Sequence, residues 1–279
     1  MQLKEIPIGL VGIESNTVKA YLAVMEQNGL RPRSLILIKP PITGKALLLS
    51  RLIGLSNLKR LRKYKRAGGS KPIRIFQKCF QKTFNLEFDF FSDIRTKDYG
   101  NKFYEVYADN INDQRVIQAL KLSKENVVIY GGGGIVKKPF FHLGISIIHT
   151  HPGYLPFIRG SHGVFWSLLV RKKFGATVFY MNEGIDLGEI ILRKEYPTSL
   201  FPEISESAET IEKLLNFYLD PLIRAKTLIE VLMRDLNYNS LDVSQQDSSE
   251  GETYFRMQTP MRLEVAKSLL GGSNSCLKN

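Results

Sequence analysis

Acidic residues are missing from a long stretch of this 279-residue chain, because no Asp or Glu lies between Gln27 and Leu86. The segment from Lys45 to Lys82 carries twelve Lys and Arg residues, in a chain whose net charge is +12. Such a basic block indicates an anionic partner: a phosphorylated substrate, a nucleic acid or an acidic membrane surface. The alternative is a helical excursion whose charged face is only solvated.

Cysteines and long apolar runs are also scarce. The two cysteines, Cys79 and Cys276, lie far apart in the sequence, which argues against a disulfide framework and is typical of a reducing compartment. The chain has no apolar run of about eighteen residues, so a membrane span is not predicted. The first apolar run is short and follows no basic start, unlike a signal peptide. We therefore expect a cytoplasmic protein.

Strands alternate with helical patterns along most of the chain. Apolar runs predict strands at 6–13, 34–38, 104–108, 126–130, 144–149, 176–181 and 189–197. Helical spacing of apolar residues follows the polar turn at 14–16 and is seen again at 112–122 and 161–172. Asn112 or Asp113 can act as the cap of the second of these predicted helices. This alternation predicts an α/β fold with an open, mostly parallel sheet covered by helices on both faces. The short loop between the last two strands predicts an antiparallel pair.

The C-terminal part predicts a helical extension of this domain. Residues 207–219 show a helical pattern, and Asp220-Pro221 is expected to start a second helix, with Asp as its cap and Pro at its first position. We expect an α/β domain over 1–200 with a basic helical insertion at 40–90. Helices at 201–236 would pack on it, and 237–279 would form a linker and tail. Within that tail, "TYFRM" is expected to return as a short strand or docked segment.

Three of the four histidines lie in "IIHTHPGYLPFIRGSHG", residues 147–163. His149 and His151 are two residues apart and would share one face of a strand, as metal ligands can. They could instead only satisfy backbone groups at the end of the strand. In an open α/β sheet, however, the functional crevice lies at the carboxyl ends of the strands, where these histidines are placed. The glycines at 131–134 and Asp186 would reach the same edge, and a His beside a carboxylate suits proton transfer.

The segment "HTHPGYLPFIRG", followed by "ATVFYMNEGIDLGEII", resembles the folate-dependent formyltransferase family. That family has Asn-x-His-Pro-(x)3-Pro-(x)2-Arg-Gly and then Gly-x-Asp-x-Gly, after a Rossmann-like start. The resemblance covers about 105–197, extends more weakly to 6–38 and does not include 40–90. "DNIN" before residue 113 resembles the family's Asn-x-Asn segment, and "GETYFRM" at 251–257 resembles a C-terminal segment of some nucleotide-sugar members. One position departs from the pattern, because His149 stands where the family has a catalytic Asn.

The resemblance implies transfer of a formyl group from N10-formyltetrahydrofolate to an amine. His151 would stabilise the oxyanion, and Asp186 would orient His151 and move a proton to the leaving nitrogen. His149 would be a second oxyanion donor. The folate would lie between two loops, and the acceptor would contact basic residues. The implied cofactor-binding residues are Gly132, Gly133, Gly134, Ile135, Val136, Asn182, Glu183, Gly184 and Ile185. Arg159 is expected to bind the substrate, and the acid-free charge run predicts that Lys59, Arg60, Arg62 or Lys63 contacts the anionic acceptor. No metal is expected.

An anionic, phosphorylated acceptor would suit the basic block, and a nucleotide-linked amino sugar fits best. Aminoacyl-tRNA is an alternative that is not favoured, since no second β-barrel domain is visible after residue 236. A deformylase, with water as the acceptor, is another. An inactive binding protein on the same fold and an RNA-binding module that uses 45–82 are alternatives of a different class. The sequence leaves open whether the chain forms a homodimer.

Overall fold

A computed structural model describes residues 3–41, 71–86, 102–132, 134–201, 206–234, 238, 240–247 and 249–270. Three residues expected at the site, Lys59, Arg60 and Gly133, lie outside the described residues, as does most of the basic insertion.

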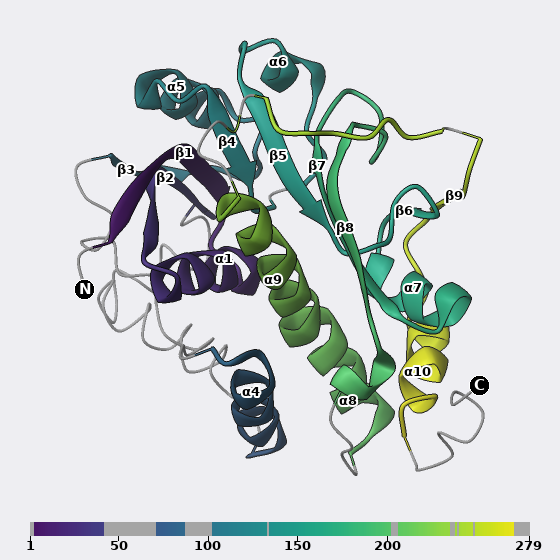
Figure 1. Ribbon diagram of the computed structural model, residues 1–279. Coiled ribbons are helices and arrows are strands. Elements are labelled where there is room, and N and C mark those ends of the chain that lie inside the picture. The colour runs from purple at the N-terminus through teal and green to yellow at the C-terminus, as the bar shows by residue number, and fades with distance from the viewer. Residues whose placement is uncertain are drawn as a thin grey trace.

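Seven strands form one twisted sheet in the order β3-β2-β1-β4-β5-β7-β8 (Figure 1). Their bounds are β1 Lys4–Ile13, β2 Leu30–Lys39, β3 Phe103–Tyr107, β4 Val127–Tyr130, β5 Ser146–His151, β7 Phe174–Tyr180 and β8 Ile190–Tyr196. The strands from β3 to β5 are parallel, and β7 and β8 are antiparallel to each other. The predicted mostly parallel sheet and the antiparallel pair are therefore confirmed. The sequence did not predict that β7 also runs antiparallel to β5.

Helices cover both faces of the sheet, as predicted. Helix α1 (Asn16–Gln27) and helix α9 (Asp220–Leu232) pack against each other on one face, and α9 also contacts β5, β7 and β8 (Figure 1). Helix α5 (Gln114–Ser123) packs on β2 and β3. Two separate apolar clusters fill the two faces. In chain order, the short helix α6 (Lys138–Phe141) comes between β4 and β5, and α7 (Gly163–Arg171) comes before β7. The open α/β class is thus confirmed.

The basic insertion is helical where the structure describes it. Helix α4 (Lys71–Phe84) buries Phe76, Phe80 and Phe84, and the rings of Phe76 and Phe80 contact that of Phe201. The side chains of Arg74, Lys78 and Lys82 recur every fourth residue and are exposed. Because spacing of four residues keeps side chains on one face of a helix, α4 carries its charge on the side opposite to its aromatic stripe.

Helix α9 begins at Asp220 with Pro221 in its first turn, as expected, but the expectation that Asp220 is a cap that separates two helices is wrong. The helix α8 (Ala208–Leu214) continues through a π-helical turn, η3 (Leu215–Leu219), directly into α9, and Asp220 has helical dihedrals (φ −49°, ψ −56°). Proline removes the N–H that would bond the carbonyl four residues earlier, and its ring crowds that carbonyl. Here the carbonyl of Phe217 accepts from Asn16 Nδ2 at 2.7 Å instead. A side chain of the β1–α1 loop therefore satisfies the group that proline leaves unpaired, and the helix need not end.

The expected linker and tail also differ from the structure. Ser244 forms a β-bridge with Ile190, and β9 (Glu252–Tyr254) pairs in parallel with β6 (Ile158–Gly160). Helix α10 (Thr259–Lys267) contacts α8 and α7. Figure 1 shows this segment crossing the β8 edge of the sheet on its way to β9. The expectation that "TYFRM" returns as a short strand is confirmed. A 3₁₀ turn, η2 (Thr198–Leu200), follows β8.

Among the described residues, no helix combines the length and the apolar character that crossing a membrane requires.

Candidate functional site

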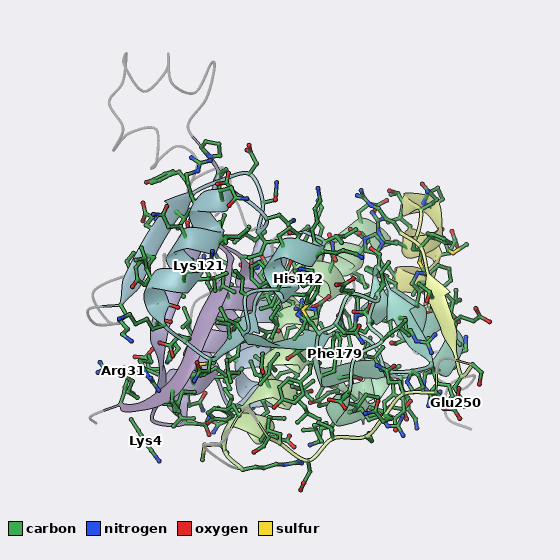
Figure 2. All side chains as sticks on the ribbon, turned by 90° about the horizontal axis from the view of Figure 1, so that it is seen from above. Lys4, Arg31, Lys121, His142, Phe179 and Glu250 are labelled. Atoms are coloured by element: carbon green, nitrogen blue, oxygen red, sulfur yellow. The ribbon has the colours of Figure 1, made fainter. Side chains whose placement is uncertain are left out.

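The site lies at the end of β5, where the strand passes between β4 and β7. His149 is in register with Tyr130 on one side and Phe179 on the other, and His151 is in register with Thr177. Because side chains alternate along a strand, both histidines are on the same face of the sheet. Figure 2, which views the molecule from above, labels Phe179, the residue in register with His149, and His142, which directly follows α6.

His151 is held by contacts at both ring nitrogens. Its Nε2 lies 2.9 Å from the carbonyl oxygen of Ile158 and must carry the proton, because a carbonyl only accepts. Its Nδ1 lies 3.3 Å from Asp186 Oδ2. The residue is 2% exposed, and a Cβ at Gly153 would come within 2.6 Å of Nε2. Nε2 is thus engaged by the Ile158 carbonyl while Nδ1 faces the Asp186 carboxylate, and the implied role of His151 as an oxyanion donor stays a prediction.

Asp186 connects three segments that are distant in the sequence. Its Oδ2 accepts from the backbone N–H of Gly160 at 2.8 Å and faces His151, as the family resemblance implied. Its own backbone has φ +54°, in the left-handed region, which is tolerated best by Gly, Asn and Asp. Gln246 Nε2 donates to the carbonyl oxygens of Asp186 at 2.9 Å and Gly188 at 2.6 Å. Both the carboxylate and the loop that carries it are therefore fixed.

His149 has a different environment from His151. Its Nδ1 lies 3.0 Å from the carbonyl oxygen of Tyr130, and its ring lies between those of Tyr130 and Phe179, with centroid distances of 5.1 and 5.8 Å. Burial lowers the pKa of His149 well below its ordinary value, and the charge of Arg224 lowers that pKa further. The ring is therefore neutral at pH 7, with its proton on Nδ1 and a lone pair on Nε2. A lone pair cannot stabilise an oxyanion, so the expected donor role of His149 is wrong in this geometry.

The loop after β4 presents open backbone, as expected of a ligand-binding loop. Gly132 and Gly134 have φ values of +106° and +102°, and a Cβ at either would meet nothing within 4 Å. The Tyr130 hydroxyl donates to the carbonyl of Gly134, so the residue that bonds His149 also holds this loop. Ile135 is 77% exposed, whereas Val136 packs on the apolar cluster beside β4.

Asn112 binds the C-terminal end of the same loop through two hydrogen bonds. Its Nδ2 donates to the carbonyl of Ile135 at 2.9 Å, and its Oδ1 accepts from the N–H of Lys137 at 2.8 Å. From the sequence, Asn112 is expected only to be a possible helix cap within "DNIN". The cap of α5 is Asp113, so the side chain of Asn112 is available for the loop.

The second loop expected to bind folate, 182–185, is linked to α6. Glu183 forms ion pairs with Lys138 at 3.1 Å and with His142 at 3.2 Å, and the hydrogen bond from Lys138 contributes most to lowering the pKa of Glu183. Asn182 Oδ1 accepts from the N–H of Gly184 at 3.0 Å and shapes the turn. Ile185 is 56% exposed. The carboxylate of Glu183 thus links the 182–185 loop to helix α6, which follows the glycine loop in the chain.

Arg159 does not match its expected role as a substrate-binding residue. The residue is 4% exposed, and its Nη2 donates to the carbonyl oxygens of Asp247, at 3.3 Å, and of Glu250. It lies in β6, which pairs with β9, so its guanidinium holds the C-terminal segment next to the site. Only the tertiary structure places these carbonyls near Arg159.

Sequence reasoning also missed Gln246 and a buried polar group beneath the site. Gln246 lies in a polar stretch that is typical of a linker, and no local pattern marks it. Arg224 is 9% exposed, and its Nη1 lies 3.4 Å from Asp220 Oδ1. An Asp and an Arg four residues apart on a helix are a signal for this pair, but the charge effect on His149 depends on the packing of α9.

The described residues contain no group of three or more His, Cys, Asp or Glu side chains placed to hold a metal ion.

Comparisons with known proteins identify the same segment. Residues 93–217 match the family model described as "Formyl transferase", which confirms the predicted resemblance over that part of the chain. A methionyl-tRNA formyltransferase of Syntrophus aciditrophicus is 32% identical over 123 residues, covering 43% of this chain and 38% of the relative. The human mitochondrial 10-formyltetrahydrofolate dehydrogenase is 30% identical over 122 residues, covering 43% of this chain and 12% of the relative.

The matched segment therefore spans well under half of the length of these curated relatives. Among solved structures, a sugar N-formyltransferase from Shewanella sp FDAARGOS_354 is similar, with a TM-score of 0.49 and 14% identity, covering 93% of this chain and 87% of that chain.

Proposed function

We propose that this protein transfers a formyl group from N10-formyltetrahydrofolate to an amine. The observation that carries the proposal is that the segment matching the formyl transferase family contains His149, His151 and Asp186, and that the fold brings these three side chains together. Tyr130 also links His149 to the open glycine loop, because its carbonyl oxygen accepts from His149 and its hydroxyl donates to the carbonyl of Gly134. A reactive centre beside a loop with exposed backbone is suited to a bound planar ligand.

The residues present fit the folate donor, which the reaction consumes as a substrate. Gly132 and Gly134 leave their backbone uncovered, and Ile135 and Ile185 are exposed apolar side chains on the two loops. Glu183 links the second loop to α6, which follows the first loop in the chain. A flat ring can cover such apolar side chains while its edges bond backbone groups. The loops 132–136 and 182–185 would therefore hold the donor.

Within this site, Asp186 and His151 act as a rigid support. The carboxylate of Asp186 receives the N–H of Gly160 and faces His151, whose other nitrogen binds Ile158. This arrangement fixes the 158–160 strand and the 186–188 loop beside the reacting groups. Alignment of this kind lowers the barrier because the reactants need not be ordered at each turnover.

For the acceptor we propose an anionic amine, with a nucleotide-linked amino sugar as the first choice. The acid-free stretch between Gln27 and Leu86 supports a phosphorylated acceptor, and exposed basic side chains on α4 carry part of its charge. Contacts of the acceptor with Lys59 and Arg60 stay a prediction. Methionyl-tRNA is the second candidate, because it is the substrate that the name of the Syntrophus relative indicates.

The proposal is tested by calorimetry with 5-formyltetrahydrofolate, a stable analogue of the donor, followed by formyl-transfer assays on nucleotide amino sugars. We expect saturable binding of the analogue and transfer to one of these amines. Asp186→Asn should lower kcat by about 10²-fold, because a shift of the reacting groups by about 1 Å can cost that much. Absence of analogue binding by a folded wild-type protein would contradict the proposal.

A further inference from the structure

The two site histidines differ in which ring nitrogen lacks a protein partner. His151 uses both nitrogens, for the carbonyl of Ile158 and for Asp186. His149 uses Nδ1 for the carbonyl of Tyr130, and within the described residues no hydrogen bond involves its Nε2. His149 is also only half-buried, whereas His151 is 2% exposed. Nε2 of His149 is therefore the one nitrogen of this histidine pair that can meet a substrate.

The hydrogen bond to Tyr130 decides what this nitrogen can do. A carbonyl oxygen accepts and never donates, so Nδ1 carries the ring proton whenever the ring is neutral. Nε2 then presents a lone pair, which makes it a base and not a hydrogen-bond donor.

We propose that His149 Nε2 is the base that takes a proton from the attacking amine, an inference that rests on the proposed formyl transfer. The amine nitrogen bonds to the formyl carbon as the carbonyl π electrons move to oxygen, and one N–H proton passes to Nε2. The carbonyl then re-forms, the bond from carbon to the leaving nitrogen breaks, and the imidazolium returns its proton to that nitrogen. The products are a formamide and the free secondary amine of the donor, so protons and electrons balance.

The surroundings of His149 suit a proton that is held only briefly. Arg224 on α9 and His151 on β5 both disfavour a positive charge on the ring, and the Tyr130 carbonyl on β4 favours it. The nearest aromatic neighbours, Tyr130 and Phe179, add no charge at neutral pH. An imidazolium in this position is a stronger acid than free histidine. It can therefore protonate a leaving nitrogen that is weakly basic because an aromatic ring conjugates with it.

The first test does not depend on activity. In two-bond 1H–15N spectra of protein with 15N-labelled histidine, assigned with His149→Gln, we expect His149 to be neutral at pH 7 with its proton on Nδ1. We expect this state to persist as the pH falls through the ordinary histidine range. A ring that carries its proton on Nε2 at pH 7, or one that is charged there, would overturn the proposal.

The second test compares His149→Asn with His149→Gln in the transfer assay. The Asn side chain can keep the donor to the Tyr130 carbonyl, and the Gln side chain can place an amide near Nε2, but neither has a base. Both variants should bind 5-formyltetrahydrofolate like the wild type and lose about 10²-fold or more in kcat. The acid limb of the wild-type pH–rate profile should disappear in both, with the acceptor KM changed only slightly.

The outcomes separate the two proposals. If the wild type transfers formyl and His149→Asn keeps wild-type kcat together with the acid limb, the base is not His149 and only this inference fails. If the wild type neither binds the folate analogue nor transfers a formyl group to any amine tested, the proposed function fails and takes this inference with it.

Discussion

The parallel half of the sheet and the edge that carries the site share a buried apolar core, but the loops at that edge are in addition fixed by polar contacts. In the parallel half, β1 contributes Ile8 and Leu10 and its neighbours contribute Leu35 and Ile129, all of which are 0% exposed. Around β5, β7 and β8, loops are also fixed by side chains that bond backbone groups. Arg193 donates to the carbonyl of Leu155 at 2.9 Å in the same way as Gln246 donates to that of Asp186.

The apolar core and the polar contacts contribute differently to the stability of the fold and to the positions of the site residues. Burial of apolar surface is roughly proportional to area and has no preferred direction, so it stabilises the fold without setting the position of any one atom. Hydrogen bonds weaken steeply when their distance or angle changes, so they fix atoms to within tenths of an ångström. We infer that the parallel half supplies most of the free energy of folding and that the polar edge supplies the geometry of the site.

Substituting the parallel core should have the largest effect on stability. Leu10→Ala removes a side chain that is 0% exposed and should lower the free energy of unfolding by about 2–5 kcal/mol. Urea denaturation followed by circular dichroism measures this loss. Leu122→Ala on α5, where the side chain is 60% exposed, is the matched control and should change stability by less than about 0.5 kcal/mol. Equal losses in the two variants would contradict the assignment of the core.

A substitution at the polar edge should act on the site more than on the fold. Gln246→Ala removes the donor to the carbonyls of Asp186 and Gly188, at a cost of about 1–2 kcal/mol. The amide of Gly160, which donates to Asp186, should exchange with solvent faster in NMR hydrogen-exchange measurements. Gln245→Ala is the control, because the hydrogen bond that Gln245 forms in the described part of the chain goes to the half-buried Glu189 side chain and not to the Asp186 loop. If Gly160 exchanges equally in both variants, Gln246 does not position the Asp186 loop.

The smallest effect is expected at the cap of α5, which lies away from the site. Hydrogen bonds from the Arg115 side chain and backbone lower the pKa of Asp113 from 3.8 to about 2. Because the folded-state pKa is depressed, the stabilisation is fully present above about pH 4 and is lost as the pH falls through about 2. Asp113→Ala should therefore cost about 1 kcal/mol at neutral pH and little at the acid end of that range.

Thermal unfolding between pH 7 and pH 2 measures the Asp113 effect. Asp109→Ala, a nearby exposed residue outside the helix cap, serves as the control and should follow the wild type. A deficit of Asp113→Ala that stays constant with pH would show that the carboxylate does not stabilise α5 through its charge.

The sequence by itself determined the fold class and the location of the site. Apolar periodicity placed the strands of the main sheet, and local hydrogen bonding placed the caps Ser15 and Asp113, since a cap bonds residues only two or three positions away. The two-residue period of a strand put His149 and His151 on one face, and the position of Asp186 in the loop after the strand at 176–181 predicted that it reaches the same edge. Each of these properties depends on neighbours in the sequence.

Only the tertiary structure decided which chemistry each site residue can perform. The carbonyls of Tyr130 and Ile158 decide which ring nitrogen of His149 and of His151 carries a proton. The guanidinium of Arg159 donates to carbonyls of a segment about ninety positions away in the sequence. Every residue has the same backbone carbonyl, so no side-chain pattern shows which carbonyl a given group will meet. The helix likewise continues through Pro221 because the side-chain amide of Asn16, distant in sequence, donates a hydrogen bond to the carbonyl of Phe217. Hydrogen-bond partners of this kind are fixed by packing, because every peptide group offers the same donor and acceptor and only proximity selects between them.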